Sequence, residues 1–295
     1  MFSIRNDRLW FRGRAACACV VLLTWAPAIQ AACASTDAIA TMVRDWRALM
    51  PLLGVAHELT LEDGLCTQQL FLAELAKTQG RVVGYKAGLT NRALQQRFGY
   101  PQPLRGTLFE KMLLLDGAHV AARFGARPVV EADLLVEVGD DALQQATTPI
   151  EVLRSLSRVT AFIELPDLVL ADGEPVTGAA IAAINVGARL GVVGGSIPVE
   201  ATPAFVAALA RMQIVVTDHD GAELTRGQGT AILDHPLNAV IWLAQDLARA
   251  GIKLKRGDLL SLGAFAPPLV PRAGTTITVS YEGLPGAISA SVTFN

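Results

Sequence analysis

The chain has 295 residues, of which 52% are hydrophobic and 18% are charged. Its 25 Lys and Arg residues against 27 Asp and Glu residues leave no basic excess for a polyanion, so we expect no nucleic-acid partner. The four cysteines and four histidines form no cluster with zinc-ligand spacing. The length is sufficient for one sizeable core with a smaller helical part.

Residues 1–31 are interpreted as a secretory signal peptide. Four arginines precede an apolar stretch over 15–28, and small residues follow it. Because a membrane span needs roughly 20 apolar residues, we expect cleavage and no membrane partner afterwards. The mature protein is then periplasmic or secreted, or cytoplasmic if the leader is a wrong start site. Cys33 and Cys66 remain in it, and the sequence leaves open whether they are bridged or Cys33 is lipidated.

Two helices are predicted over 36–79, because apolar residues recur every three or four positions on either side of a break at Thr60. A strand over 82–87 and a short helix over 91–98 follow. Lys86 stands among apolar residues in this strand, where a lysine is costly unless a counter-charge meets it. It is either a lysine of an edge strand that extends its ammonium into water or the partner of an acidic ligand.

Two acids at Glu131 and Asp133 precede a lone acid, Glu164, in an apolar run. Positions i and i+2 of a strand share a face, so the first two carboxylates lie side by side, and a cation or protons must relieve their repulsion. Mg²⁺ or Mn²⁺ prefers such oxygen ligands. The alternative is that the pair forms the solvated face of an edge strand.

From about residue 101 the chain changes to short β-type runs separated by Gly, Pro and Asp. The predicted strands and hairpins cover 112–117, 127–139, 160–170, 182–195, 213–224, 258–267, 275–284 and 287–294. One helix over 235–250 interrupts them, with Asp234 as its expected N-cap and Pro236 in its first turn. We therefore expect an α+β fold, with a helical N-terminal region over 36–100 on a mixed β-sheet domain over 101–295.

Several motifs in combination resemble the 2-keto-4-pentenoate hydratase group of the fumarylacetoacetate hydrolase superfamily. A K-x-G-L-T segment begins at Lys86, G-T-L-F occupies 106–109, and the acid pair at Glu131 has Asp where the family's E-x-E has its second Glu. Residues 227–260 resemble the family's block G-x-G…HP-x-NAV-x-WLA…L-x-x-G-D. The resemblance extends from about residue 41 to the end of the chain.

This resemblance implies a mixed β-sheet roll of the fumarylacetoacetate hydrolase C-terminal type, with a divalent metal, Mg²⁺ or Mn²⁺, in its mouth. The implied metal ligands are Glu131, Asp133 and Glu164. The implied catalytic residue is Lys86, which would neutralise substrate charge or move a proton. The implied substrate-binding residues are Gly88, Leu89, Asn185 and Gly263. Because family members associate, we also expect a homo-oligomer.

The implied activity is that of a metal-dependent lyase acting on a small 2-oxo acid, with addition of water to a 2-hydroxydienoate favoured, as by a 2-oxopent-4-enoate hydratase. The alternatives are decarboxylation of a 2-oxo-3-enedioate, hydrolysis of an acylpyruvate with His235 as the candidate base, and periplasmic oxo-acid binding without turnover. Departures from the family pattern keep the last alternative open. Leu104 and Arg105 replace an acid before G-T-L-F, and Ile184 and Gly187 replace the acid and the hydroxyl of a D-N-A-S segment.

Overall fold

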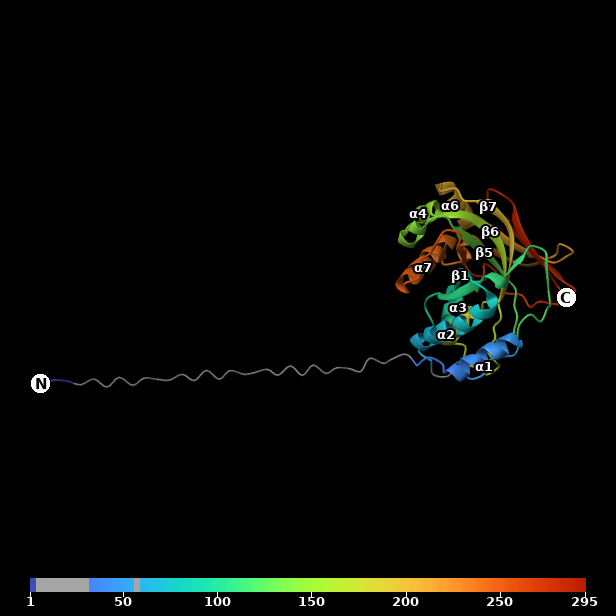
Figure 1. Cartoon of the computed structure of the whole chain (residues 1–295). Helices are drawn as coiled ribbons and strands as arrows, with labels where there is room; N and C mark the ends of the chain where they lie inside the picture. Colours follow the sequence, from blue (N-terminus) through green and yellow to red (C-terminus); the bar gives the residue numbers. More distant parts are fainter. Residues whose placement is uncertain (4–31, 56–58) are drawn as a thin grey trace. The chain divides into compact units, whose positions relative to one another are not determined.

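The computed structural model describes residues 1–3, 32–55 and 59–295 (Figure 1). The predicted leader therefore lies almost wholly outside the described residues. Ala31–Asn295 form one compact unit. Among the described residues, no helix has both the length and the apolar character that crossing a membrane requires.

The two predicted N-terminal helices are confirmed. Helix α1 (Thr36–Arg47) is capped by Ser35, and α2 (Leu61–Gln79) begins after Thr60, whose side chain forms a reciprocal capping box with Asp63. A disulfide between Cys33 and Cys66 ties the segment before α1 to α2. The sequence left open whether Cys33 is bridged or lipidated, and in the structure it is bridged to Cys66.

Twelve strands in the described residues form two sheets. They are β1 (Val82–Gly88), β2 (Leu104–Phe109), β3 (Leu113–Leu115), β4 (Ala118–Val120), β5 (Glu131–Val138), β6 (Leu156–Leu165), β7 (Leu190–Pro198), β8 (Gln213–Thr217), β9 (Glu223–Gln228), β10 (Leu259–Ser261), β11 (Thr276–Glu282) and β12 (Ile288–Phe294). The larger sheet has the order β2-β1-β10-β5-β6-β7-β3, and the smaller has β4-β12-β11-β8-β9. Both sheets are mixed, as predicted. Strands β1 and β2, from either side of the predicted domain boundary at residue 100, pair with each other.

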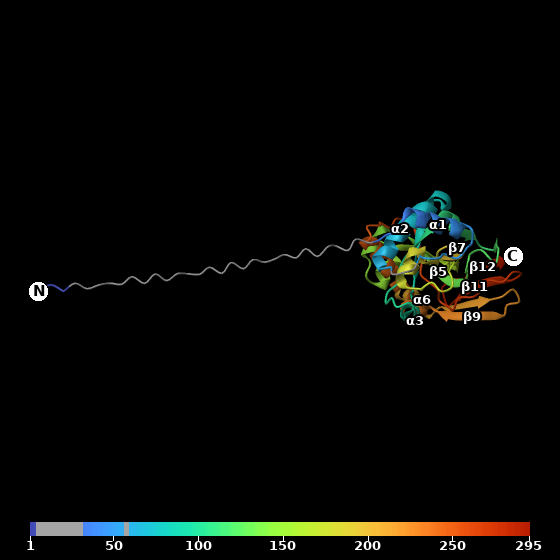
Figure 2. The ribbon, with the colours of Figure 1, turned by 90° about the horizontal axis from the view of Figure 1, so that it is seen from below.

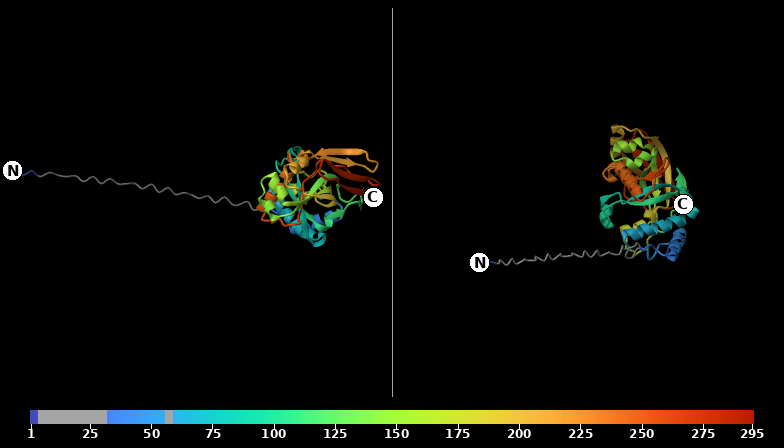
Figure 3. Two further views of the ribbon diagram at one scale, coloured as in Figure 1. Left: turned by 90° about the horizontal axis from the view of Figure 1, so that it is seen from above. Right: turned by 60° about the vertical axis from the view of Figure 1, so that its left-hand side comes forward.

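Helices lie on both sides of the larger sheet. Figure 1 shows α4 (Pro149–Arg154), α6 (Pro203–Arg211) and α7 (Pro236–Arg249) together beside β5, β6 and β7, and α1 and α2 at the opposite end. Figure 2 shows β9, β11 and β12 of the smaller sheet near the C-terminus, and Figure 3 shows the molecule from two further directions.

Three helices and the strands β2 and β4 were not predicted. Parts of three predicted strands are wrong, since β6 ends at Leu165 and β10 at Ser261, before the predicted ends at 170 and 267. Helices α4, α5 (Gly178–Ala183) and α6 have six to nine residues, too few for a clear apolar period. Each nevertheless begins after a threonine that caps it, which is a helix-start signal in the sequence. The predicted strand over 182–195 in fact begins as the end of α5 and the 3₁₀ turn Asn185–Gly187, and only the part from Leu190 onward is β7.

The short helix α3 (Arg92–Arg97) and the long helix α7 lie where the sequence predicted helices, with one correction. The N-cap of α7 is His235 and not Asp234. Asp234 has a positive φ of 65° and its carboxylate pairs with Arg92 at 3.0 Å. The cap is therefore displaced by one residue because the turn before the helix uses Asp234 in a left-handed conformation.

The alternation of side chains along β5 directs its residues to two different cores. Ala132, Leu134 and Val136 belong to the core shared with α7 and the smaller sheet. Leu135, between them, belongs to the core formed with α1 and α2. Asp133 lies two residues from Leu135 and so shares the face toward the N-terminal helices. This face carries the predicted site.

Candidate active site

Two of the predicted acidic residues face each other on neighbouring strands. Glu131, the first residue of β5, is in register with Glu164 near the end of β6. Paired residues of an antiparallel sheet share a face, and Asp133 is on that face two positions along β5. Because β5 lies between β10 and β6, the acid pair is not on an edge strand.

Lys86 reaches the same group of acids from β1. This strand lies between β2 and β10, so Lys86 is not an edge-strand residue, and it is only 3% exposed. Its ammonium forms an ion pair with Glu164 and donates a hydrogen bond to the backbone oxygen of Val186 at 3.0 Å. The structure therefore brings a buried cation from the first part of the chain to carboxylates from the second.

Burial controls the ionisation of this cluster. It raises the pKa of Glu131 to about 8, an effect that the charge of Glu164 increases and that of Lys86 opposes. It also raises the pKa of Asp133 to about 7, again with a contribution from Glu164. Burial alone would lower the pKa of Lys86, but the three carboxylates outweigh it and the pKa is raised. Lys86 is thus an ammonium at neutral pH, and burial favours the protonated form of Glu131.

The oxygen donors of the cluster fit a hard divalent cation. Both carboxylate oxygens of Glu164 are buried, and beyond the ion pair with Lys86 neither has a hydrogen-bond partner among the described residues. A buried carboxylate without donors is unfavourable, and a cation beside it relieves that penalty. Glu131, directly opposite, supplies a second carboxylate of the kind that Mg²⁺ and Mn²⁺ prefer.

A tighter acidic group lies elsewhere, in the turn between β8 and β9. Asp218, His219 and Asp220 have ligand atoms within 4.8 Å of one another, and no other such group of three occurs in the described part of the chain. The Asp218 carboxylate accepts hydrogen bonds from the backbone of Asp220 and Ala222, so it shapes the turn. The ligand atoms of Glu131, Asp133 and Glu164 therefore do not all lie within 4.8 Å of one another.

Curated relatives of the chain are hydratases. A 2-keto-4-pentenoate hydratase of Burkholderia vietnamiensis is 34% identical over 221 residues, which cover 75% of this chain and 82% of that protein. A 2-keto-4-pentenoate hydratase of Dechloromonas aromatica is 32% identical over 263 residues, 87% of this chain and 96% of that protein. This chain belongs to the 2-keto-4-pentenoate hydratase family. No family model matches it.

Solved structures show the fold of this hydratase-family chain. The 4-oxalocrotonate decarboxylase of Pseudomonas putida, solved with magnesium and adipate, has a TM-score of 0.75 at 22% identity, with 88% of this chain and 96% of that chain covered. The fumarylpyruvate hydrolase of Pseudomonas aeruginosa has a TM-score of 0.50 at 15% identity, with 72% and 89% covered. The predicted α+β fold of the fumarylacetoacetate hydrolase type is confirmed.

In this family member, three of the predicted substrate-binding residues line the ends of β1 and β10. Leu89 follows Gly88 with a positive φ of 54° and is buried. Gly263 has a φ of 106°, and a Cβ there would lie 2.3 Å from the hydroxyl oxygen of Thr90. These two strand ends therefore pack tightly beside Lys86, and contact with a substrate stays a prediction.

The fourth predicted substrate-binding residue, Asn185, is fully buried, and its side chain forms hydrogen bonds with the backbone of β2. Its amide oxygen accepts the backbone N–H of Thr107 at 2.7 Å, and its amide nitrogen donates to the backbone oxygen of the same residue at 2.9 Å. Asn185 thereby extends the hydrogen bonding of β2 and holds the turn that presents the Val186 oxygen to Lys86. A direct substrate contact by this side chain also stays a prediction.

Two of the residues that depart from the family motifs, Leu104 and Ile184, are apolar and belong to cores. Leu104 packs in a small buried cluster with Leu89, Ala182 and Val186, next to the end of β1. Ile184 belongs to the core under α1 and α2. The neighbouring Arg105 instead forms an ion pair with Asp246 of α7. The side chains of Leu104 and Ile184 thus carry no polar group, and the guanidinium of Arg105 is paired.

The imidazole of His235 is engaged at both nitrogens. Nδ1 accepts the backbone N–H of Leu237 at 3.1 Å, and Nε2 lies 3.1 Å from the backbone oxygen of Val206. Burial lowers the pKa of His235. This histidine caps a helix, as the sequence context of the HP motif allowed.

Two groups in the site were not identified as functional from the sequence. The backbone oxygen of Val186 accepts from Lys86, and the hydroxyl of Ser261 donates to Asp133 at 2.5 Å. The serine stands two residues before Gly263 in the sequence, so its position was a usable signal. No sequence signal identifies a backbone carbonyl 100 residues away from its lysine.

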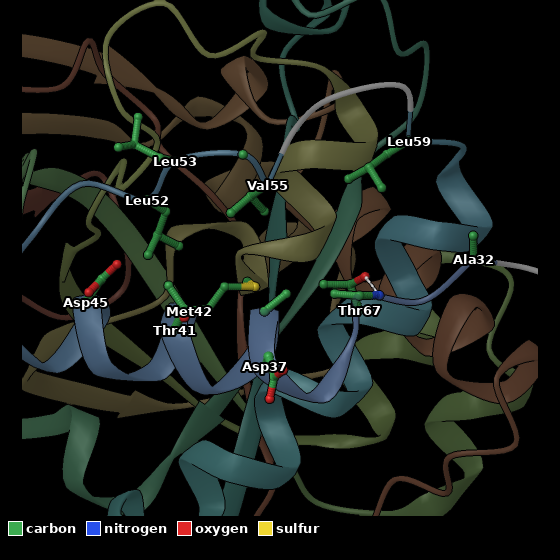
Figure 4. Close-up of a pocket in the computed structure, with 13 residues that line it drawn as sticks. Ala32, Asp37, Thr41, Met42, Asp45, Leu52, Leu53, Val55, Leu59 and Thr67 are labelled. Carbon is green, nitrogen blue, oxygen red and sulfur yellow. Dashed lines mark hydrogen bonds between the residues drawn. The ribbon is translucent and has the colours of Figure 1, made fainter.

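A separate cavity of about 380 Å³ lies beside α1 (Figure 4). Met42 of α1, Leu52 and Val55 line it, together with the carboxylates of Asp37 and Asp45. None of the predicted site residues lines this cavity. It is therefore distinct from the acidic cluster around Lys86.

Proposed function

We propose that this chain is a metal-dependent hydro-lyase of small 2-oxo acids, which adds water to a 2-hydroxydienoate as a 2-oxopent-4-enoate hydratase does. The observation that carries the proposal is the buried ammonium of Lys86 against Glu164, whose oxygens have no hydrogen-bond partner beyond that ion pair among the described residues. A cation and an acidic metal site side by side suit an oxo acid, which bears a carboxylate and a keto oxygen. The names of the curated relatives support the same class of reaction.

We further propose Mg²⁺ or Mn²⁺ as the cofactor, held by Glu131 and Glu164. Solved relatives contain magnesium or manganese together with adipate or pyruvate, which supports a divalent ion. When bound, such an ion would polarise the keto oxygen of an oxo acid and favour the enolate form. Asp133 lies on the same face of the sheet, two positions along β5 from Glu131.

Lys86 has the protonation state that the reaction needs. Because its pKa is raised, it is an ammonium that can attract a substrate carboxylate and can donate a proton when the dienol becomes the ketone. Protonation of the dienol at C5 leaves a C3=C4 double bond conjugated to the C2 carbonyl, and water can add to it at C4. The hydrogen bond to the Val186 oxygen fixes the direction of the ammonium at 3.0 Å.

Hydrolysis of an acylpyruvate is less well supported. That reaction needs a base to activate the attacking water, and His235, the base considered from the sequence, is committed to the backbone at both ring nitrogens. Hydration also releases a proton when water adds, and a carboxylate of the cluster can accept it. The names of the curated relatives favour the lyase.

Export and self-association are parts of the same proposal. The disulfide between Cys33 and Cys66 supports an oxidising compartment, where such bonds persist. We accordingly propose a periplasmic or secreted protein. We also propose a homo-oligomer, as the family resemblance implies.

One assay tests the activity. Mature protein is incubated with 2-hydroxypenta-2,4-dienoate and Mg²⁺, and loss of the ultraviolet absorbance of the diene is followed with and without EDTA. We expect metal-dependent loss and formation of a 4-hydroxy-2-oxo acid, detected by mass spectrometry. Binding of the acid without turnover would indicate a silent binding protein, and carbon dioxide release from a 2-oxo-3-enedioate alone would indicate a decarboxylase.

A further inference from the structure

We propose that Asp133 is a positioning residue that holds the turn after β10, and that it does not ligate the metal. The inference rests on the proposed function, since it concerns how the metal site is divided between its acids. It reduces the protein carboxylates on the ion from three to two, Glu131 and Glu164.

The hydrogen bonds of Asp133 carry the inference. One carboxylate oxygen, Oδ1, accepts backbone N–H groups of Leu262 at 3.0 Å and Gly263 at 2.9 Å, besides that of Leu134. The other, Oδ2, accepts the hydroxyl of Ser261 at 2.5 Å. Oδ1, with three donors, has no lone pair left for a metal, and Oδ2 already shares one of its two with Ser261. The side chain is also fully buried.

The side of β5 on which the Asp133 carboxylate finds its hydrogen bonds supports the same inference. In the sheet, β10 lies on one side of β5 and β6 lies on the other. The hydrogen-bond partners of Asp133 belong to β10 and the turn that follows it, whereas Glu164 belongs to β6. Glu164 shows the opposite state, with both oxygens buried and no partner beyond Lys86 among the described residues. The two acids thus differ in their need for a cation.

The turn that Asp133 holds is in contact with the strand of Lys86. A Cβ at Gly263 would lie 2.3 Å from the Thr90 hydroxyl oxygen and 3.1 Å from the Ala87 backbone oxygen. Any displacement of this turn therefore disturbs the end of β1 just past Lys86. By fixing Gly263, Asp133 sets the distance between β1 and β5 on the face that carries the site.

The test compares metal binding in four variants of the full mature protein: D133N, D133A, E131Q and E164Q. Titration calorimetry with Mn²⁺ should show that E131Q and E164Q raise the Kd by at least about 30-fold, whereas D133N raises it by no more than about threefold, because only a lost ligand removes a metal bond. Asparagine retains an oxygen that can accept the N–H groups of Leu262 and Gly263, and its amide can donate to Ser261. In EDTA, D133A should therefore lower the melting temperature, whereas D133N should keep it near that of the wild type. E131Q is the matched control that leaves the turn intact.

A crystal structure with Mn²⁺, located by its anomalous signal, gives a readout independent of affinity. We expect an oxygen of each glutamate at about 2.2 Å from the ion and both Asp133 oxygens on Ser261, Leu262 and Gly263. Asp133 in the coordination sphere, or a D133N loss as large as that of E131Q, overturns the inference and leaves the proposed function standing. Failure of the wild type to bind Mn²⁺ overturns the proposed function itself and, with it, this inference.

Discussion

At the scale of single residues, the site depends on one lysine that is kept charged in a buried place. Lys86 is 3% exposed and would lose its proton more readily there if it stood alone, but three acids raise its pKa. In return its ammonium is the only partner of the Glu164 carboxylate among the described residues. Removing either side chain leaves an uncompensated buried charge, so the pair should be sensitive to substitution.

We expect Lys86→Met to lower kcat by about 10²-fold or more, the usual scale for a lost acid or base, while Mn²⁺ affinity is retained or increased. Metal affinity should not fall, because the variant removes a cation that competes for Glu164. Steady-state kinetics and calorimetry on the same preparation measure both effects. Lys77→Met, at an exposed position on α2, is the control. Unchanged kcat in the Lys86 variant would remove the residue from the mechanism.

The raised pKa values predict how the stability of the metal-free protein varies with pH. Those of Glu131, about 8, and Asp133, about 7, lie above the ordinary values of 4.5 and 3.8. Within this window the native state retains protons that the unfolded state has released, so the free energy of unfolding falls as pH rises from about 4 to about 8. Lys86 is protonated in both states there and adds no slope.

Thermal melting in EDTA across that range should therefore show a falling Tm. Saturating Mn²⁺ should reduce the fall, because the cation replaces the protons, and E131Q should have a shallower slope than the wild type. If the Tm in EDTA does not change with pH, Glu131 and Asp133 are not shielded from water in the way that the structure indicates.

At the scale of elements, four segments that are separate in the sequence meet on one sheet face. Strand β1 brings Lys86, β5 and β6 bring the acids, and the 3₁₀ turn over Asn185–Gly187 brings the carbonyl that orients the lysine. Helix α2 supports this turn from behind, since the Gln68 amide donates to the backbone oxygens of Arg105 and Ala182. The position of α2 is in turn fixed by its disulfide to the segment before α1.

Reduction of this disulfide should therefore destabilise the protein. Opening a loop with a sequence separation of 33 residues costs about 3 to 4 kcal/mol of unfolding free energy in the chain-entropy model. Urea unfolding with and without a reductant measures the difference. A Cys33→Ser, Cys66→Ser double variant should match the reduced protein and show no response to the reductant. Equal stability of the oxidised and reduced wild type would contradict the prediction.

At the scale of the whole molecule, the leader and the disulfide point to the same compartment. The arginine-flanked apolar stretch lies outside the described residues, so export stays a prediction from the sequence. The disulfide is an independent observation on the part that is described.

We expect the mature chain to begin near Ala32 and to be recovered from the periplasm or the medium of a bacterial host. N-terminal sequencing of the purified product and fractionation of the cells decide this. A variant with two of the leader arginines, Arg12 and Arg14, changed to Glu should stay in the cytoplasm. Intact Met1 on a cytoplasmic wild-type product would contradict export.

The sequence by itself determined the class of fold, the family and the main acidic residues. Helical periodicity with capping residues predicted α1, α2 and α7, and strand alternation predicted β5 with its acid pair. These features are local, so neighbouring residues contain the information. The short helices α4, α5 and α6 were missed because each is shorter than the period analysis requires.

Only the tertiary structure decided which acid pairs with Lys86 and which does not. Sequence spacing treats Glu131 and Asp133 as equivalent neighbours, but Asp133 turns to β10 for its hydrogen bonds while Glu131 faces Glu164 on β6. The order of strands in the sheet is set by contacts between residues far apart in the chain. The division of roles within the site follows from that order and from the hydrogen-bond donors that each neighbouring strand supplies.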